Sequence, residues 1–353
     1  MSPAWMETSM RWSSAFAAAS LFTAALAFPL AAHPDRALPT FVHKLKYAMG
    51  TVVEIVVYDD SVARASAAID RGLQEMIRID LMMSNFDPGS ELSRLNQSAY
   101  AQAQEVSPDL YRVMEESLNY SRLSGGEFDV TVGPLVDLQK AALRGEHVAG
   151  AAEEEKLRSC VGYEKVELIP PNRIRLHSPC LRIDLGSIGK GYAVDRAAEV
   201  LRASGIKSAL INAGGSSVYA IGAPPGETAW LVHLRDPSGK LDPRVMLTEN
   251  SVSTSEQTPA SLLTDESAGH IIDPAKGLPL KTSLAVSIVA KSTAASDALS
   301  TTLLLLGPQR GKQLLQKLPH TAAIWVSPAG ETHLVSNGPE IEITNAVAAS
   351  KVQ

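Results

Sequence analysis

The order of apolar and polar positions along the chain predicts strands and helices in irregular succession. Residues 51–58, TVVEIVVY, are rich in β-branched side chains and are followed by two aspartates, which is typical of a strand. Residues 63–83 repeat apolar positions at helical spacing and contain no proline, which predicts a helix. A second helix is expected to begin at Ser107 and Pro108, where serine suits the cap and proline the first turn, and to end at Gly125.

The second half of the chain predicts shorter elements. Strands are expected at residues 166–169, 174–176, a segment ending at Asp184, 209–212, 217–221, 230–235, 285–290 and 322–326. Helices are expected near Cys160 and at residues 188–204, 294–306 and 308–318. Residues 256–269 are polar and follow neither pattern, which predicts a mobile loop. Because strands come in consecutive runs with helices between them at irregular intervals, we predict an α+β fold of mixed or antiparallel sheets packed with helices.

The beginning of the chain indicates a targeting segment. An apolar run over residues 13–32 follows Arg11, is broken by Pro29 and ends in small residues, which is typical of a cleavable signal. We therefore predict that residues 1–32 form a signal peptide and that the mature chain is periplasmic. The alternative is an uncleaved inner-membrane anchor, because the run approaches the roughly 20 residues that a bilayer requires.

Composition narrows the possible partners. The chain has 353 residues, a formal net charge of −6 and 45% hydrophobic residues, which excludes a disordered or collagen-like protein. No nucleic-acid partner is expected, because proteins that neutralise many phosphates usually carry a basic excess. The two cysteines, Cys160 and Cys180, can either form a disulfide in an exported chain or remain two buried thiols.

A glycine-rich turn is the first candidate for chemistry. Residues 184–195, DLGSIGKGYAVD, connect a predicted strand to a predicted helix through three glycines and Lys190. Backbone amides at a helix start, together with a lysine, can hold a phosphate group. The spacing matches neither the dinucleotide-binding fingerprint nor the Walker A loop. The segment is thus either a phosphate site of another kind or a tight strand-to-helix connection.

Two further patterns suggest a metal and a base. Asp297 and Thr301 are four residues apart in a predicted helix and so share one face, where their oxygens would suit Mg²⁺. The alternative is that Asp297 favours the helix dipole and Thr301 is a surface hydroxyl. His270 follows the polar loop and precedes an Asp-Pro turn at Asp273, so it is either a base acting near neutral pH or a structural histidine.

Taken together, these segments resemble the ApbE family of FAD:protein FMN transferases. The resemblance rests on the joint order of several motifs between residues 49 and 307. They are Met49-Gly-Thr51, Ser84-Asn-Phe86, Phe128-Asp129-Val-Thr131, residues 184–195, Asn212-Ala-Gly-Gly215, Ser253-Thr254-Ser255, His270-Ile-Ile-Asp-Pro and Ser296-Asp297-Ala-Leu-Ser-Thr301. It implies one ApbE-like domain over residues 40–345. The sequence departs from the family pattern at Glu256, where glycine is usual, at Ala275-Lys276-Gly277, which replaces an Arg-Thr-Gly turn, and at Ser216, where Asp or Asn is frequent.

The resemblance implies an exported, Mg²⁺-dependent enzyme that cleaves FAD between its phosphates. FMN would pass to a Ser or Thr hydroxyl of an acceptor protein, AMP would leave, and the acceptor or an uncleaved signal could bring the enzyme near a membrane. By this resemblance the residues in contact with FAD would be Met49, Phe86, Glu127, Phe128, Asp129, Asp184 and Lys190. Asp297, Thr301 and the main chain of Ser187 would hold the metal, and His270 would deprotonate the acceptor hydroxyl. The alternatives are an FAD pyrophosphatase that forms FMN and AMP, and a non-catalytic exported FAD-binding protein.

Overall fold

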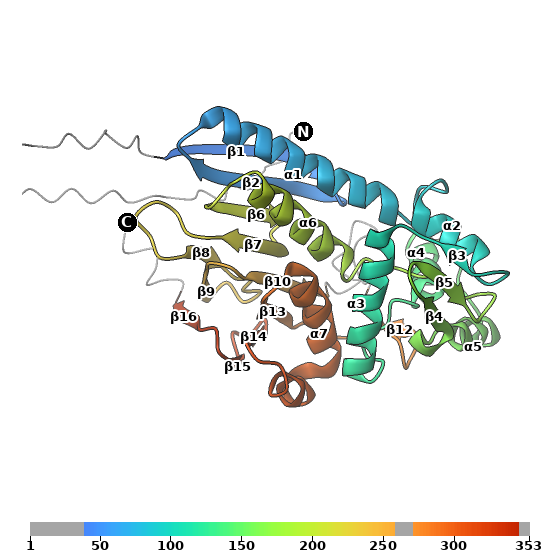
Figure 1. Cartoon of the computed structure of the whole chain (residues 1–353). Helices are drawn as coiled ribbons and strands as arrows, with labels where there is room; N and C mark the ends of the chain where they lie inside the picture. The colour runs from blue at the N-terminus through green and yellow to red at the C-terminus, as the bar shows by residue number, and fades with distance from the viewer. Residues whose placement is uncertain (1–38, 258–270, 346–353) are drawn as a thin grey trace, which may run out of the picture. The chain divides into compact units, whose positions relative to one another are not determined.

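The structure, a computed structural model, describes residues 39–257 and 271–345 (Figure 1). The predicted signal peptide and His270 therefore lie outside the described residues. All described residues belong to one compact unit that begins at Pro39. None of the helices in these two ranges is long and apolar enough to cross a membrane.

An eight-stranded antiparallel sheet forms the centre of this unit, with the strand order β1-β2-β6-β7-β10-β13-β14-β15. The strands are β1 (Thr40–Ala48), β2 (Thr51–Asp59), β6 (Ala209–Ala213), β7 (Ser217–Ile221), β10 (Ser251–Glu256), β13 (Ala285–Ala290), β14 (Thr321–Val326) and β15 (Thr332–Asn337). Because side chains alternate between the two faces of a strand, both faces of this largely buried sheet need a cover.

Helices cover one face of the sheet. They are α1 (Val62–Met83), α6 (Gly189–Ala203) and α7 (Thr293–Leu315), which lie beside one another in Figure 1. On β2, Ile55 packs with residues of α1 and α6, whereas the next residue, Val56, belongs to the core on the opposite face. That opposite core lies against a second sheet of order β16-β9-β8, formed by β8 (Trp230–His233), β9 (Leu241–Leu247) and β16 (Ile341–Asn345).

A subdomain of short elements lies beyond one end of these helices (Figure 1). It comprises α2 (Glu91–Ser98), α4 (Gly133–Leu143), α5 (Ala151–Cys160), the 3-10 turn Tyr163–Lys165, a sheet of β3 (Gln104–Glu105), β5 (Arg173–Leu176) and β4 (Val166–Ile169), and a hairpin of β11 (Ile272–Asp273) and β12 (Leu278–Pro279). The helix α3 (Pro108–Ser124) runs between this part and α7. A disulfide joins Cys160 at the end of α5 to Cys180, with their Cα atoms 5.4 Å apart.

The predicted α+β fold is confirmed, and so are its long helices. The helix predicted at residues 63–83 is α1, capped by the Ser61 hydroxyl, and Gly125 ends α3 in a left-handed conformation. The two helices predicted at residues 294–306 and 308–318 are two arms of α7, because Gly307 between them has non-helical backbone angles.

One predicted strand is wrong. The segment ending at Asp184 forms only an isolated bridge between Arg182 and Val132. Its alternating buried residues resemble a strand, but the side chain of Asn96 replaces a neighbouring strand at Ile183. The Asn96 Oδ1 atom accepts from the Ile183 amide at 2.7 Å, and its Nδ2 atom donates to the Ile183 carbonyl at 3.0 Å.

The start of the predicted loop at residues 256–269 is also corrected. Glu256 is the last residue of β10 and pairs with Ala285 of β13. Residues 258–269 lie outside the described residues.

The disulfide gives a first testable prediction. Replacing both cysteines by alanine removes a cross-link between residues 20 apart in sequence. We expect the free energy of unfolding to fall by about 3 kcal/mol, because the unfolded chain regains the entropy of an open loop. Urea unfolding of the oxidised protein, the reduced protein and the double variant measures this. The reduced protein should match the double variant, and three coinciding midpoints would contradict the prediction.

Candidate functional site

A cavity of about 870 Å³ brings the predicted site residues together. Every described residue that the sequence analysis assigned to FAD or to the metal lines it, from five separate parts of the chain. These are Met49, Phe86, Glu127, Phe128, Asp129, Asp184, Ser187, Lys190, Asp297 and Thr301. The remaining predicted site residue, His270, is outside the described residues.

The turn at residues 184–191 forms one wall of the cavity. Its first residue, Asp184, is fixed by its own amide, which donates to the Val130 carbonyl at 2.7 Å. The Asp184 carboxylate accepts from the Gly186 amide at 2.8 Å, which closes the turn. Helix α6 then begins at Gly189, so Lys190 lies in its first turn, where the positive end of a helix favours an anion. The Lys190 ammonium donates to the Ser216 hydroxyl at 2.6 Å.

Asp297 lies against the end of this turn, in the first turns of α7. Its side chain is buried, with 7% of its surface exposed. The Oδ2 atom accepts from the Gly191 amide at 2.6 Å, and the Oδ1 atom accepts from the Ser217 hydroxyl at 2.7 Å. Burial raises the pKa of Asp297, whereas the charge of Lys190 and the hydrogen bonds to the carboxylate lower it. A carboxylate in this position gains from a nearby cation, because its own protein partners are neutral donors.

Gly191 permits this contact between α6 and α7. A Cβ atom at Gly191 would lie 2.2 Å from the Thr293 carbonyl oxygen, well inside van der Waals contact. The third glycine of the 184–195 motif is thus required by the close approach of two helices. It is not explained by the phosphate turn alone.

The oxygens available for a metal are a carboxylate, a hydroxyl and main-chain carbonyls. Thr301 lines the cavity one turn after Asp297, and its hydroxyl lies 3.3 Å from that of Ser255. Hard oxygen donors of this kind suit Mg²⁺, although too few are present to complete an octahedron. Within the described ranges, no cluster of three or more His, Cys, Asp or Glu side chains could hold a metal. The donor set therefore fits a magnesium ion that also binds water and a phosphate.

The segment 127–129 lines the cavity and is also bonded to the structure behind it. Phe128 is 1% exposed, and its ring packs against Tyr120 in the core. The Asp129 carboxylate accepts from the amides of Thr131 and Tyr163 at 2.8 and 2.9 Å. Burial raises the pKa of Asp129, and these hydrogen bonds oppose the rise. The side chains thus fix the shape of the cavity wall, and Glu127 forms an ion pair with Arg310 at its rim.

Phe86 is the exposed aromatic of the site. The ring is 81% exposed, and the Lys140 ammonium lies 5.1 Å from its centroid. An exposed ring beside a cavity can stack on a planar ligand.

Met49 lies in a left-handed backbone conformation, with its amide held at 2.7 Å by the Asp80 carboxylate.

Several cavity residues were missed by sequence reasoning. Ser217 looks like an ordinary strand residue until the fold brings it to Asp297. Arg235 follows β8 and pairs with Glu256 at 2.8 Å on the cavity wall. No local signal identifies either residue, because the contacts join segments far apart in sequence.

Comparisons with known proteins show the family to which the chain belongs. The sequence model described as the ApbE family matches residues 49–325. A protein named FAD:protein FMN transferase from Treponema pallidum is 28% identical, over 81% of this chain and 84% of its own length. The protein of the same name from Vibrio cholerae is 31% identical, over 69% of this chain and 73% of its own. The crystal structure of the ApbE protein from Thermotoga maritima has a TM-score of 0.73 at 26% identity and covers 83% of this chain and 96% of its own. Since the family match spans most of the chain and carries the whole described cavity wall, this chain belongs to the ApbE family.

Proposed function

We propose that this protein is a Mg²⁺-dependent FAD:protein FMN transferase. It would move FMN from FAD to a Ser or Thr hydroxyl of an acceptor protein and release AMP. The observation that carries the proposal is the buried Asp297 carboxylate with Thr301 one turn away, facing the turn of Asp184 to Lys190 across one cavity. The names of the similar proteins support the same activity.

The chain's own residues would bind and orient the substrate. The positive end of α6 and the Lys190 ammonium suit the diphosphate, and Phe86 suits the flavin ring. Asp297, Thr301 and the main chain of Ser187 would hold Mg²⁺, which supplies positive charge to the phosphate oxygens. Most of the rate enhancement in such a reaction comes from this positioning and charge stabilisation.

The chemical step is a displacement at the FMN phosphorus. The acceptor oxygen forms a bond to this phosphorus, and the bond to the bridging oxygen breaks. The bridging oxygen leaves with AMP, and the hydroxyl proton passes to His270. A base in this role contributes on the order of 10²–10⁴-fold to the rate.

The proposal includes the site of action. Residues 1–32 would be removed as a signal peptide, and the mature enzyme would work in the periplasm, near the membrane if its acceptor is embedded there. The Cys160–Cys180 disulfide supports this location, because disulfides persist in oxidising compartments.

The activity is tested by incubating the mature chain with FAD, Mg²⁺ and a Ser/Thr-containing acceptor protein. We expect the acceptor to gain the mass of an FMN phosphoester and AMP to appear in equal amount. Free FMN with AMP and an unmodified acceptor would instead assign a pyrophosphatase. Intact FAD would leave a flavin-binding protein without catalysis.

The metal assignment is tested by Asp297→Ala. We expect transfer at limiting Mg²⁺ to fall by about 10²–10³-fold, because the cavity loses its buried anionic metal ligand. Initial rates across a Mg²⁺ series measure this effect. Asp70→Ala, an exposed carboxylate paired with Lys44, is the control and should match the wild type. Wild-type rates in Asp297→Ala at low Mg²⁺ would overturn the assignment.

The base is tested by His270→Ala. We expect slower transfer, by about 10²–10⁴-fold, with unchanged FAD affinity, since the imidazole is assigned only to the acceptor proton. His177→Ala serves as the matched control, because His177 is exposed and contacts Glu167. Stopped assays give the rate, and flavin fluorescence gives the affinity. Equal transfer rates in the two variants would remove His270 from the mechanism.

A further inference from the structure

Asp195 of α6 is bound to the beginning of α7. Its two carboxylate oxygens accept from the amides of Thr293 and Ala294 at 2.7 and 2.8 Å. Ser292 accepts the next two amides of this helix, from Ala295 through its hydroxyl and from Ser296 through its carbonyl. The first amides of a helix have no partner within the helix. Here those of Thr293, Ala294 and Ala295 are satisfied, two of them by a residue of another helix.

A second contact joins the same two helices one turn away. Gly191, four residues before Asp195, donates its amide to Asp297, which lies four residues after Thr293. Residues four apart lie on one face of a helix. One face of α6 therefore holds one face of α7 at two points, and the absence of a side chain at Gly191 sets how closely they approach.

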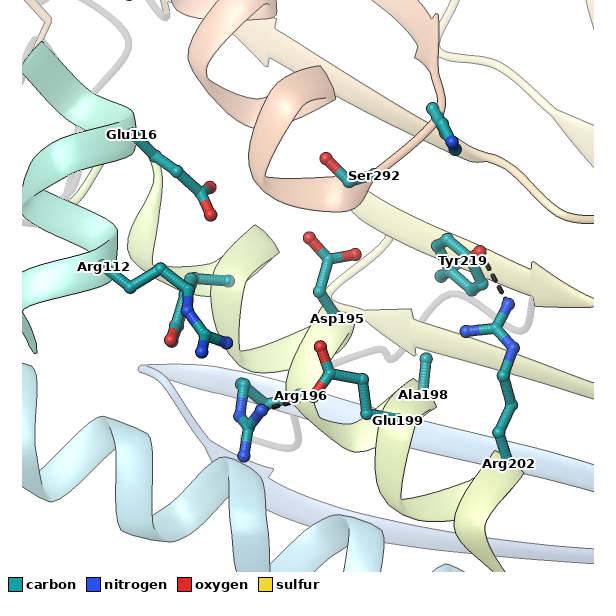
Figure 2. Close-up of a pocket in the computed structure, with 11 residues that line it drawn as sticks. Arg112, Glu116, Asp195, Arg196, Ala198, Glu199, Arg202, Tyr219 and Ser292 are labelled. Atoms are coloured by element: carbon teal, nitrogen blue, oxygen red, sulfur yellow. Dashed lines mark hydrogen bonds and ion pairs between the residues drawn. The ribbon is translucent and has the colours of Figure 1, made fainter. Parts of the chain in front are cut away.

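Asp195 is not part of the cavity of the proposed active site. It lines a separate pocket of about 340 Å³, in which its carboxylate points toward the start of α7 near Ser292 (Figure 2). The charged and titratable groups around it are Arg112 and Glu116 of α3, Tyr192, Arg196, Glu199 and Arg202 of α6, Tyr219 of β7, and Lys291. In spite of these neighbours, Asp195 forms no ion pair within residues 39–257 and 271–345.

The buried position of Asp195 changes its pKa. Burial raises the pKa of Asp195 to about 7, the charge of Glu116 adds to the rise, and the amides of Thr293 and Ala294 oppose it. Above this pH the carboxylate is ionised, and the amides of α7 are the donors that hold it.

We propose that Asp195 is a positioning residue of the transfer reaction, which fixes α7 so that Asp297 and Thr301 face the turn at residues 184–191. The inference rests on the proposed function, because it assigns Asp195 to the placement of the metal ligands. Asp195 itself does not touch the metal or the substrate. A misplacement of about 1 Å in catalytic geometry can cost on the order of 10²-fold in rate, so the anchoring of α7 has a direct effect on the site.

The test compares Asp195→Asn with the control Glu199→Gln. Glu199 lies one turn later on α6 and lines the same pocket, and its substitution removes one negative charge, as does Asp195→Asn. Mn²⁺ is titrated at pH 8 into full-length protein saturated with FAD, without acceptor, and free Mn²⁺ is followed by electron paramagnetic resonance. We expect Asp195→Asn to raise the Kd for Mn²⁺ about tenfold, because the amide offers one accepting oxygen in place of two. Glu199→Gln should stay within about twofold of the wild type, and so should the FAD affinity of both variants without metal.

A second variant tests the same contact without changing Asp195. Proline at position 293 removes one amide donor and suits the first helical position. Ser292 has φ −123° and ψ 156°, the extended conformation that precedes proline without strain. We expect Thr293→Pro to raise the Kd for Mn²⁺ about threefold. In the double variant with Asp195→Asn the two effects should not add, because they remove one shared contact.

The outcomes separate this inference from the proposed function. Wild-type Mn²⁺ affinity in folded Thr293→Pro and in Asp195→Asn would overturn the positioning role while leaving the metal site in place. If Asp195→Asn does not fold, Thr293→Pro alone decides. A wild-type protein that binds FAD but no Mn²⁺ would overturn the metal assignment itself, and the positioning role with it.

Discussion

The site depends on a carboxylate that the fold buries without giving it a cation in direct contact. Asp297 is held by the amide of Gly191 and the hydroxyl of Ser217, both neutral donors. A buried charge is costly unless it is paired, and these two hydrogen bonds offset only part of that cost. The part of the cost that they do not offset can be lowered only by a charge in the cavity, which Asp297 lines. Helix α6, strand β7 and helix α7 meet at the Asp297 side chain. The same carboxylate therefore holds three elements together and lines the site.

The contacts between α7 and the sheet hold the Asp297 side chain in its position. On one side the contact is apolar, where Leu303 belongs to the same buried cluster as Trp325 of β14. On the other side it is a series of hydroxyl contacts with β10. Ser253 lies 2.7 Å from Ser296, and Ser255 lies 2.7 Å from Ser300, oxygen to oxygen. Apolar packing tolerates small shifts along a helix, whereas paired hydroxyls have short and directional contacts. The motif residues of β10 therefore fix the height of α7 on the sheet, which sets where Thr301 faces the cavity.

The local sequence pattern predicts elements whose signals lie within a few neighbouring residues. It does not predict contacts between residues that are far apart in the sequence. The helix α3 was predicted because Ser107, Pro108 and Gly125 are cap signals that act within one turn. The edge strand β1 was not predicted, since exposed apolar residues such as Tyr47 weaken its alternation. The motif resemblance gathered the site residues in advance, but it could not reveal the partners of Asp297. Ser217 is 80 residues away in sequence, and its role arises from strand order.

The charges around the cavity support the proposal that a metal helps an anionic substrate to bind there. The acidic residues on the wall are Glu127, Asp129, Asp184, Glu256 and Asp297, against the basic residues Lys140, Lys190 and Arg235. Arg310 pairs with Glu127 and Arg235 pairs with Glu256, so these two carboxylates are compensated. Buried backbone amides hold Asp129. Asp184 and Asp297 remain, and the charge of Lys190 lowers the pKa of Asp297 without cancelling the rise that burial causes. Under the proposed function, Mg²⁺ held by Asp297, Thr301 and the main chain of Ser187 would supply the further positive charge with which this acidic wall could bind a diphosphate.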